Sequence, residues 1–212
     1  LRLLATQMLQ RRRLTAAWSE VLAWFGPDSD LATSLREVVK FGEVVRIAEA
    51  NGEAQLTFRH DRVHKWLLAD AAAHTLYDAN QDKSFMSDPF FADVTGAALA
   101  YPNVSPALAE RIRLTNPLAL FYSINAFRVS SAPIHAAVLA STERWLADSK
   151  SHSRANQSLR FAALHILSNT QSDHVRPLLG HFRERSWAAH LAGLRNGDVD
   201  AAIQLCARLE PG

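Results

Sequence analysis

Cysteine is nearly absent from this 212-residue chain, which contains only Cys206. One thiol cannot form a disulfide within the chain, so the small disulfide-stabilised folds of secreted domains are excluded. Long apolar runs are also missing, because no stretch approaches the roughly 20 apolar residues that a spanning helix needs. The cluster Arg11, Arg12 and Arg13 follows the first apolar segment, which is the reverse of a secretory signal. We therefore expect a cytoplasmic protein with no membrane partner.

The chain also has no large excess of positive or negative charge, because its 23 lysines and arginines nearly balance its 21 aspartates and glutamates. A net charge of +2 gives little reason to expect a nucleic-acid partner, whose phosphates attract strongly basic surfaces. The chain is 48% hydrophobic and 21% charged, which is typical of a folded globular protein of one or two domains. It begins at Leu1 rather than methionine, and we expect it to be part of a longer protein.

Motifs for catalysis and for metal or nucleotide binding are missing too. There is no GxxxxGK[ST] phosphate-binding loop, no HExxH zinc motif and no GxSxG nucleophile elbow. Nine histidines are scattered without a cysteine pair or a close His/Asp/Glu set, so zinc is not expected. Glu110 and Glu143 lie on separate amphipathic segments, which favours solvated surface over an acid/base pair. We expect no enzyme activity, no metal and no cofactor in this chain itself.

Residues 1–42 have the apolar spacing of three short helices. Thr15 is expected to cap the second helix, because its hydroxyl can accept a backbone N–H, and Gly26 should end that helix. Ser29 or Asp30 is expected to cap the third helix, which closes at another glycine.

A β-hairpin is the clearest local signal, in the stretch EVVRIAEANGEAQLTF. Its central Asn-Gly pair predicts a two-residue type I′ turn between two runs rich in β-formers. That turn pairs Ile47 with Leu56 and Val45 with Phe58, which places apolar side chains of both strands on one face. The sequence therefore predicts two paired strands with a defined register.

The second strand ends at Phe58, and Arg59, His60 and Asp61 lie between it and an amphipathic helix. Asp61 suits the N-cap of that helix, because its carboxylate can accept a backbone N–H and favours the positive end of the dipole. Arg59 and His60 would then be polar surface beside the hairpin. One side of the helix carries Val63, Trp66, Leu67, Ala71 and His74.

From about residue 85 onward the strand signals disappear. Amphipathic segments joined by short polar turns follow one another, the pattern of stacked helical pairs in an α-solenoid. The segment AAHLAGLRNGDVDAAIQLCARLEP looks like a HEAT-type repeat. Helical spacing places Trp145, Phe161 and Trp187 in the core, although a solenoid groove can expose such groups as anchors for a partner.

Three helices, a hairpin and a further helix describe a winged-helix unit in residues 1–80, followed by helical repeats in residues 81–212. With Phe-Arg-His-Asp at residues 58–61, this arrangement resembles the C-terminal portion of STAND-class signalling NTPases of the NACHT and NB-ARC type. In that family the winged helix follows a P-loop ATPase core, and this corner carries the MHD-type His-Asp motif. The expected fold is mainly α: a winged-helix domain with a small two-stranded β-wing, followed by a HEAT-like α-solenoid.

The resemblance implies roles for the residues of the corner. His60 is the sensor that contacts the β-phosphate of ADP, Asp61 orients it or caps the helix, and Arg59 lies beside it. ADP or ATP with Mg²⁺ would be bound by an upstream NTPase core of the full-length protein. Oligomerisation of that full-length protein stays open. The repeats would recognise a protein or other macromolecular trigger, in signalling or antiviral defence.

Two other interpretations stay open. The first is a transcription regulator with a winged-helix DNA reader and a helical ligand-binding or dimerisation domain. Its third helix carries Arg36 and Lys40 against Asp30 and Glu37, a poor balance for a surface approaching phosphates. The second is a HEAT-like protein-binding scaffold in which residues 1–80 are only a terminal cap.

Overall fold

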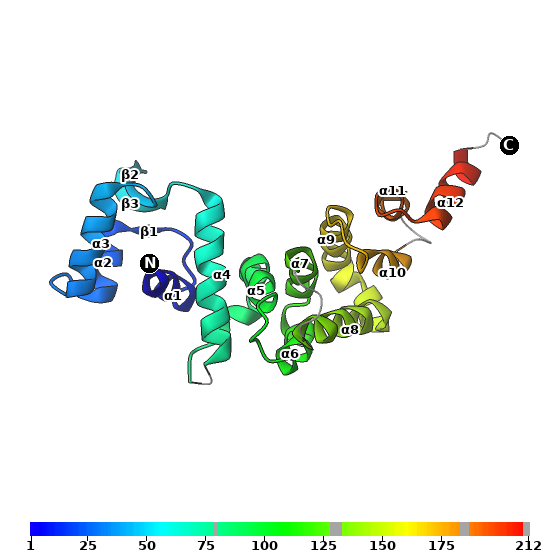
Figure 1. Ribbon diagram of the computed structural model, residues 1–212, viewed down its shortest axis with the longest axis horizontal. Coiled ribbons are helices and arrows are strands. Elements are labelled where there is room, and N and C mark those ends of the chain that lie inside the picture. Colours follow the sequence, from blue (N-terminus) through cyan, green and yellow to red (C-terminus); the bar gives the residue numbers. More distant parts are fainter. Residues whose placement is uncertain (79, 128–132, 183–186, 210–212) are drawn as a thin grey trace. The chain divides into compact units, whose positions relative to one another are not determined.

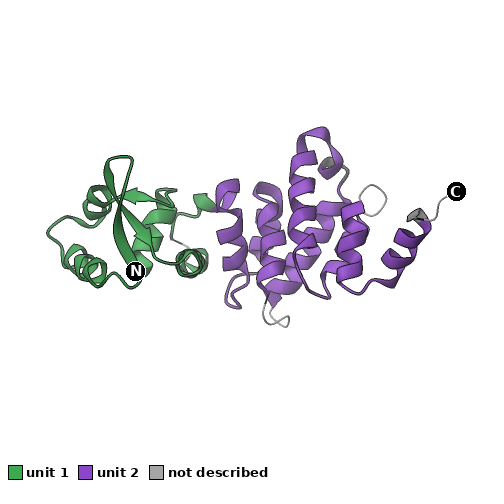
Figure 2. Ribbon diagram, turned by 90° about the horizontal axis from the view of Figure 1, so that it is seen from above, with its two compact units in different colours: residues 1–85 green, residues 86–212 purple. Residues whose placement is uncertain are grey.

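The computed structural model is mainly α-helical, with twelve α-helices among the described residues and a three-stranded antiparallel sheet near the N-terminus. It describes all residues except 79, 128–132, 183–186 and 210–212. The chain divides into two compact units, residues 1–85 (unit 1) and residues 86–212 (unit 2), coloured separately in Figure 2. The sequence predicted a boundary between residues 80 and 81.

Unit 1 combines four helices with the small sheet. In chain order its elements are α1 (Arg2–Gln10), β1 (Ala16–Ala17), α2 (Trp18–Phe25), α3 (Asp30–Phe41), β2 (Val45–Ala50), β3 (Glu53–Phe58) and α4 (Asp61–Tyr77) (Figure 1). Strands β2 and β3 have the predicted register, with Ile47 opposite Leu56 and Val45 opposite Phe58. The turn is formed by an Asn-Gly pair at residues 51–52 with φ angles of 56° and 75°, as a type I′ turn requires. The predicted hairpin is confirmed.

The prediction of only two strands was wrong. Ala16 pairs with Leu56 and Ala17 with Gln55, so β1 lies antiparallel to β3 and the strand order is β1-β3-β2. Thr15 consequently does not cap α2; the N-cap is Ala17, in an extended conformation and without a side-chain capping bond. A two-residue strand shows no alternation of apolar and polar residues, so only the tertiary pairing reveals it.

The ends of α3 follow the sequence signals. The Ser29 hydroxyl accepts the N–H of Ala32 at 3.1 Å, as an N-cap does, and Gly42 ends the helix with a left-handed φ of 67°. Helix α1 packs against α4, where the Arg2 guanidinium donates to the Asp70 carboxylate at 2.7 Å. Large buried side chains of unit 1 include Leu4, Met8, Leu9, Val21, Val45, Leu56 and Leu68.

The predicted apolar side of α4 is only partly correct. Leu67 and Ala71 are buried, whereas Trp66 and His74 are exposed. The His74 ring lies 2.9 Å from the backbone carbonyl oxygen of Asp70, one turn earlier in the same helix. Helical spacing identifies residues that share a side of α4, but the packing against α1 decides which of them are covered.

Unit 2 consists of helices joined by short connections. They are α5 (Ala92–Leu99), α6 (Ala107–Thr115), α7 (Leu118–Ala126), α8 (Pro133–Ala147), α9 (Gln157–Ser168), α10 (Val175–Gly180), α11 (Trp187–Arg195) and α12 (Val199–Leu209). Short 3₁₀ turns are η1 (Ser84–Ser87), which begins in unit 1, η2 (Pro89–Phe91), η3 (Ser149–His152) and η4 (Arg154–Asn156).

Alternate helices of unit 2 pack side by side and form two rows. Helix α5 contacts α7, α7 contacts α9, and α9 contacts α11, whereas α6 contacts α8 in the other row (Figure 1). Helices that follow one another in the chain also touch, as α7 and α8 do. Helix α7 therefore packs against α5 and α9 in its own row and against α6 and α8 in the other.

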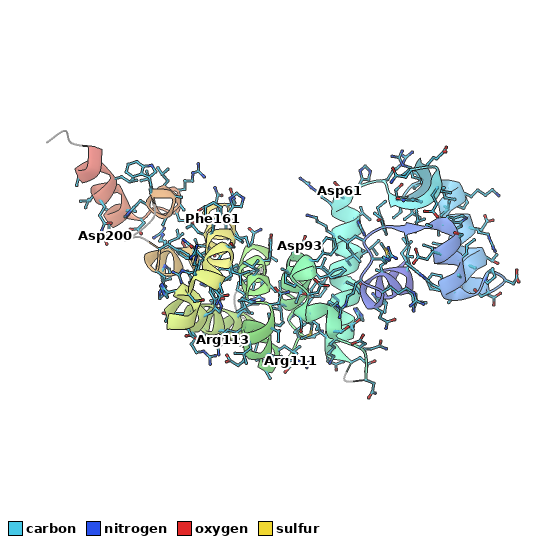
Figure 3. All side chains as sticks on the ribbon, turned by 180° about the vertical axis from the view of Figure 1, so that it is seen from behind. Asp61, Asp93, Arg111, Arg113, Phe161 and Asp200 are labelled. Carbon is cyan, nitrogen blue, oxygen red and sulfur yellow. The ribbon has the colours of Figure 1, made fainter. Side chains whose placement is uncertain are left out.

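The aromatic residues of unit 2 separate into buried and exposed groups. The ring of Trp145 is buried and meets that of Phe121 edge to face at 5.6 Å between centroids. Phe161 is 75% exposed at the surface of α9 (Figure 3), and Trp187 is also exposed. The expectation that Phe161 and Trp187 are core was wrong, because Phe161 shares a helix face with the exposed His165 rather than with the packed side of α9. Among the described residues, no helix has both the length and the apolar character needed to cross a membrane.

Candidate functional site

The backbone of the strand-to-helix corner is held by hydrogen bonds on both sides. The Arg59 N–H donates to the carbonyl oxygen of Val44 at 2.9 Å, which continues the pairing just beyond β3. His60 is the N-cap of α4, with φ −131° and ψ 124°. Its carbonyl oxygen accepts the N–H groups of Val63 at 3.0 Å and His64 at 3.1 Å. The His60 side chain is thus attached to a hydrogen-bonded backbone between the end of β3 and the start of α4.

Asp61 is not the N-cap that the sequence predicted. It is the first residue of α4, and the cap position belongs to His60, whose side chain makes no capping hydrogen bond. The difference is one residue, because the chain is still extended at His60 and turns helical at Asp61. The carboxylate of Asp61 nevertheless lies in the first turn, where the helix dipole favours a negative charge.

The side chains of the corner face solvent. Arg59, His60, Asp61 and Arg62 are all exposed, and together with Val63 they line an open hollow at the start of α4. Figure 3 shows Asp61 at this end of the helix. Two guanidinium groups outnumber the one carboxylate, so the hollow carries positive charge before the imidazole is counted. Guanidinium and imidazole N–H groups are donors that suit an anionic oxygen such as that of a phosphate.

Two residues of the corner, His64 and Arg62, were not identified from the sequence. The rings of Phe58 and His64 stack with centroids 4.2 Å apart and an interplanar angle of 7°, which joins the end of β3 to the first turn of α4. Arg62 lines the hollow, although a cation in a first helical turn opposes the dipole. That unfavourable placement of Arg62 was a signal available in the sequence, whereas the stacked pair depends on the three-dimensional turn.

A second group of charged side chains joins α6 to α8 in unit 2. Glu110 accepts hydrogen bonds from Nε and Nη2 of Arg113 at 2.9 and 2.7 Å, and Nη1 of Arg144 lies 3.2 Å from its other oxygen. The hydrogen bond from Arg113 lowers the pKa of Glu110, against the opposing effect of burial. The same bond raises the pKa of Arg113. Glu110 therefore connects α6 to α8 by ion pairs, while its side chain remains 40% exposed, in keeping with the solvated surface position expected from the sequence.

Within the described part of the chain, no group of three or more His, Cys, Asp or Glu residues could hold a metal ion. The corner of unit 1 is open on its solvent side, so its N–H donors are accessible to an anion.

Comparison of the chain with protein-family models, with curated proteins and with solved structures finds no match.

Proposed function

We propose that this chain is the non-catalytic regulatory and sensor part of a STAND-type NTPase. Unit 1 is interpreted as a winged helix and unit 2 as a HEAT-like α-solenoid. The observation that carries the proposal is the exposed imidazole of His60, attached to a hydrogen-bonded backbone between a paired wing strand and a long helix.

The order of elements in unit 1 supports the winged-helix interpretation. A first helix, a short strand, two helices and a hairpin follow one another, and the short strand pairs with the second hairpin strand. In unit 2, alternate helices pack into two rows as they do in α-solenoids. Both features agree with a winged helix followed by helical repeats, which is the arrangement that the STAND resemblance implies.

The switch would operate through a contact between His60 and a phosphate. An N–H of the imidazole donates to the β-phosphate of ADP held by an upstream nucleotide-binding core, and Arg59 and Arg62 add positive charge nearby. This contact favours the state in which the winged helix rests on the core. Exchange for ATP with Mg²⁺ removes the contact, and the equilibrium shifts towards a released state.

The repeats would supply the input to this switch. A protein or other macromolecule that binds unit 2 in only one of the two states shifts their populations by its difference in affinity. No chemical step is assigned to the chain itself, which relays binding energy to the core.

The test joins the chain to its natural upstream segment and measures the rate of ADP release. A hydrogen bond to a charged partner contributes about 1.5–3 kcal/mol, so His60→Ala should release ADP about 10- to 100-fold faster. His165→Ala, which removes an exposed histidine of unit 2, is the matched control and should release ADP at the parental rate. An unchanged rate in His60→Ala, or an upstream segment without a phosphate-binding loop, would contradict the proposal.

A protein-binding scaffold is the second candidate, and one observation favours it. Phe161 on α9 and Trp187 on α11 are exposed on helices that contact each other. Exposed aromatic side chains on neighbouring repeats are typical anchors for a partner. This function needs no nucleotide, and it would remain if His60 proved to have no role.

A further inference from the structure

Helix α3 exposes apolar side chains where a helix-turn-helix DNA reader inserts polar and basic ones. Leu31 is 48% exposed and Phe41 is 75% exposed. Val38 lies between them, half-buried, and the three residues share one side of the helix at helical spacing. We call Leu31, Val38 and Phe41 the α3 stripe. Exposed apolar side chains gathered on one helix face indicate an interaction site more often than scattered ones do.

The segment of the chain that contains the α3 stripe has a negative net charge. Residues 26–53, which contain α3 and most of the wing, have six carboxylates and three basic side chains, a net charge of −3. Two of the three cations already have partners: Arg36 donates to the carbonyl oxygen of Pro27 at 2.7 Å, and Lys40 lies 3.9 Å from Glu37. Such a surface repels DNA phosphates and attracts a basic protein surface.

We propose that the α3 stripe binds a basic amphipathic helix of a partner protein. The apolar side of that helix covers Leu31 and Phe41, and its lysines and arginines face the carboxylates of α3 and the wing. From residue 31 to residue 41 the stripe extends about 15 Å along α3 at 1.5 Å per residue. Three helical turns of a partner match that length and present side chains at positions i, i+3 or i+4, and i+7. The proposal does not rest on the nucleotide switch.

The experiment measures binding of the full chain to two synthetic helical peptides of about 18 residues, or five turns. Both peptides have the same leucine-rich apolar face, and their polar faces carry lysine in one and glutamate in the other. The lysine peptide should bind, more weakly as salt is added, and the glutamate peptide should bind at least about tenfold more weakly.

Two variants with matched exposure locate the binding site. Phe41→Ser should weaken binding of the lysine peptide about tenfold or more, because it removes the only aromatic ring of the stripe, which is also its most exposed side chain. Tyr77→Ser is the control: Tyr77 on α4 is likewise 75% exposed, and its loss should leave the affinity unchanged. Both changes replace surface side chains, so the fold of unit 1 should persist.

Several outcomes would overturn the proposal. They are no binding of the lysine peptide, equal binding of the two peptides, or the same loss in Phe41→Ser and Tyr77→Ser. Sedimentation of the unliganded chain decides whether a second copy is the occupant: a concentration-dependent dimer lost in Phe41→Ser would assign the α3 stripe to self-association. Binding of duplex DNA that is lost in Phe41→Ser would restore the DNA-reader interpretation.

Discussion

Substitution of Gly96 by alanine should destabilise unit 2, because α5 and α7 approach each other at this residue (Figure 1). A Cβ atom at Gly96 would lie 2.5 Å from the carbonyl oxygen of Ala119 and 2.5 Å from Cβ of Tyr122. It would also lie 2.8 Å from the backbone nitrogen of Ser123. None of these atoms is the end of a flexible side chain, so the two helices must move apart by about 1 Å to reach ordinary contact distances near 3.5–4.0 Å.

The expected magnitude comes from two opposing contributions. Overpacking of a core costs about 1–3 kcal/mol, and the contact with two backbone atoms places Gly96→Ala at the upper end of that range. Alanine in place of glycine inside a helix contributes about 1 kcal/mol in the other direction. The net loss in the free energy of unfolding should therefore be about 2 kcal/mol.

Chemical denaturation followed by circular dichroism measures this loss, with Gly180→Ala as the matched control. Gly180 lies at the end of α10, and a Cβ atom there would meet nothing within 4 Å. The control should be as stable as the parent chain or slightly more stable. If Gly96→Ala unfolds at the same denaturant concentration as Gly180→Ala, the close packing of α5 on α7 is refuted.

Two further predictions concern other contacts of unit 2. Asn116→Ala should lower the free energy of unfolding by about 2–3 kcal/mol, measured by chemical denaturation. The buried Asn116 amide donates to the carbonyl oxygens of Met86 and Asp88 at 3.0 Å each, and its loss leaves both without this donor. A variant as stable as the parent chain would contradict this prediction. The pKa of Glu110 is lowered by the hydrogen bond from Arg113. The ionised Glu110 carboxylate therefore stabilises the fold fully above the unfolded pKa of about 4.3, and this stabilisation is lost as the pH falls through the lower folded pKa. Thermal melting between neutral and acidic pH should therefore show a smaller acid-induced loss of stability in Glu110→Gln than in the parent, and identical profiles would exclude this role.

The two proposals concern different parts of unit 1 and can fail independently. His60 lies at the start of α4, whereas Phe41 lies at the end of α3. The variant His60→Ala should therefore release ADP faster but bind the lysine peptide as the parent chain does. The variant Phe41→Ser should bind the peptide more weakly but retain ADP as the parent chain does. A chain in which only the peptide assay gives a positive result would be a protein-binding module without a nucleotide switch.

Local features whose physics involves only a few neighbouring residues could be predicted from the sequence. The Asn-Gly turn specified both the hairpin and its register, because a two-residue loop leaves one pairing that keeps Ile47 and Leu56 on the same face. Ser29 and Gly42 marked the ends of α3, since capping depends on a hydroxyl acceptor and on a left-handed φ at single positions. The place of His60 between strand and helix followed from the same signals.

Features that depend on packing between distant segments could be seen only in the three-dimensional structure. The third strand exists only because residues 16–17 pair with β3. Two residues are too few to show the alternation of apolar and polar side chains that predicts a strand. Helical spacing could not tell that Phe161 and Trp66 face solvent, because burial depends on which neighbouring helix covers a given side. Within the corner, the stack of Phe58 on His64 likewise required the turn itself to bring the two rings together.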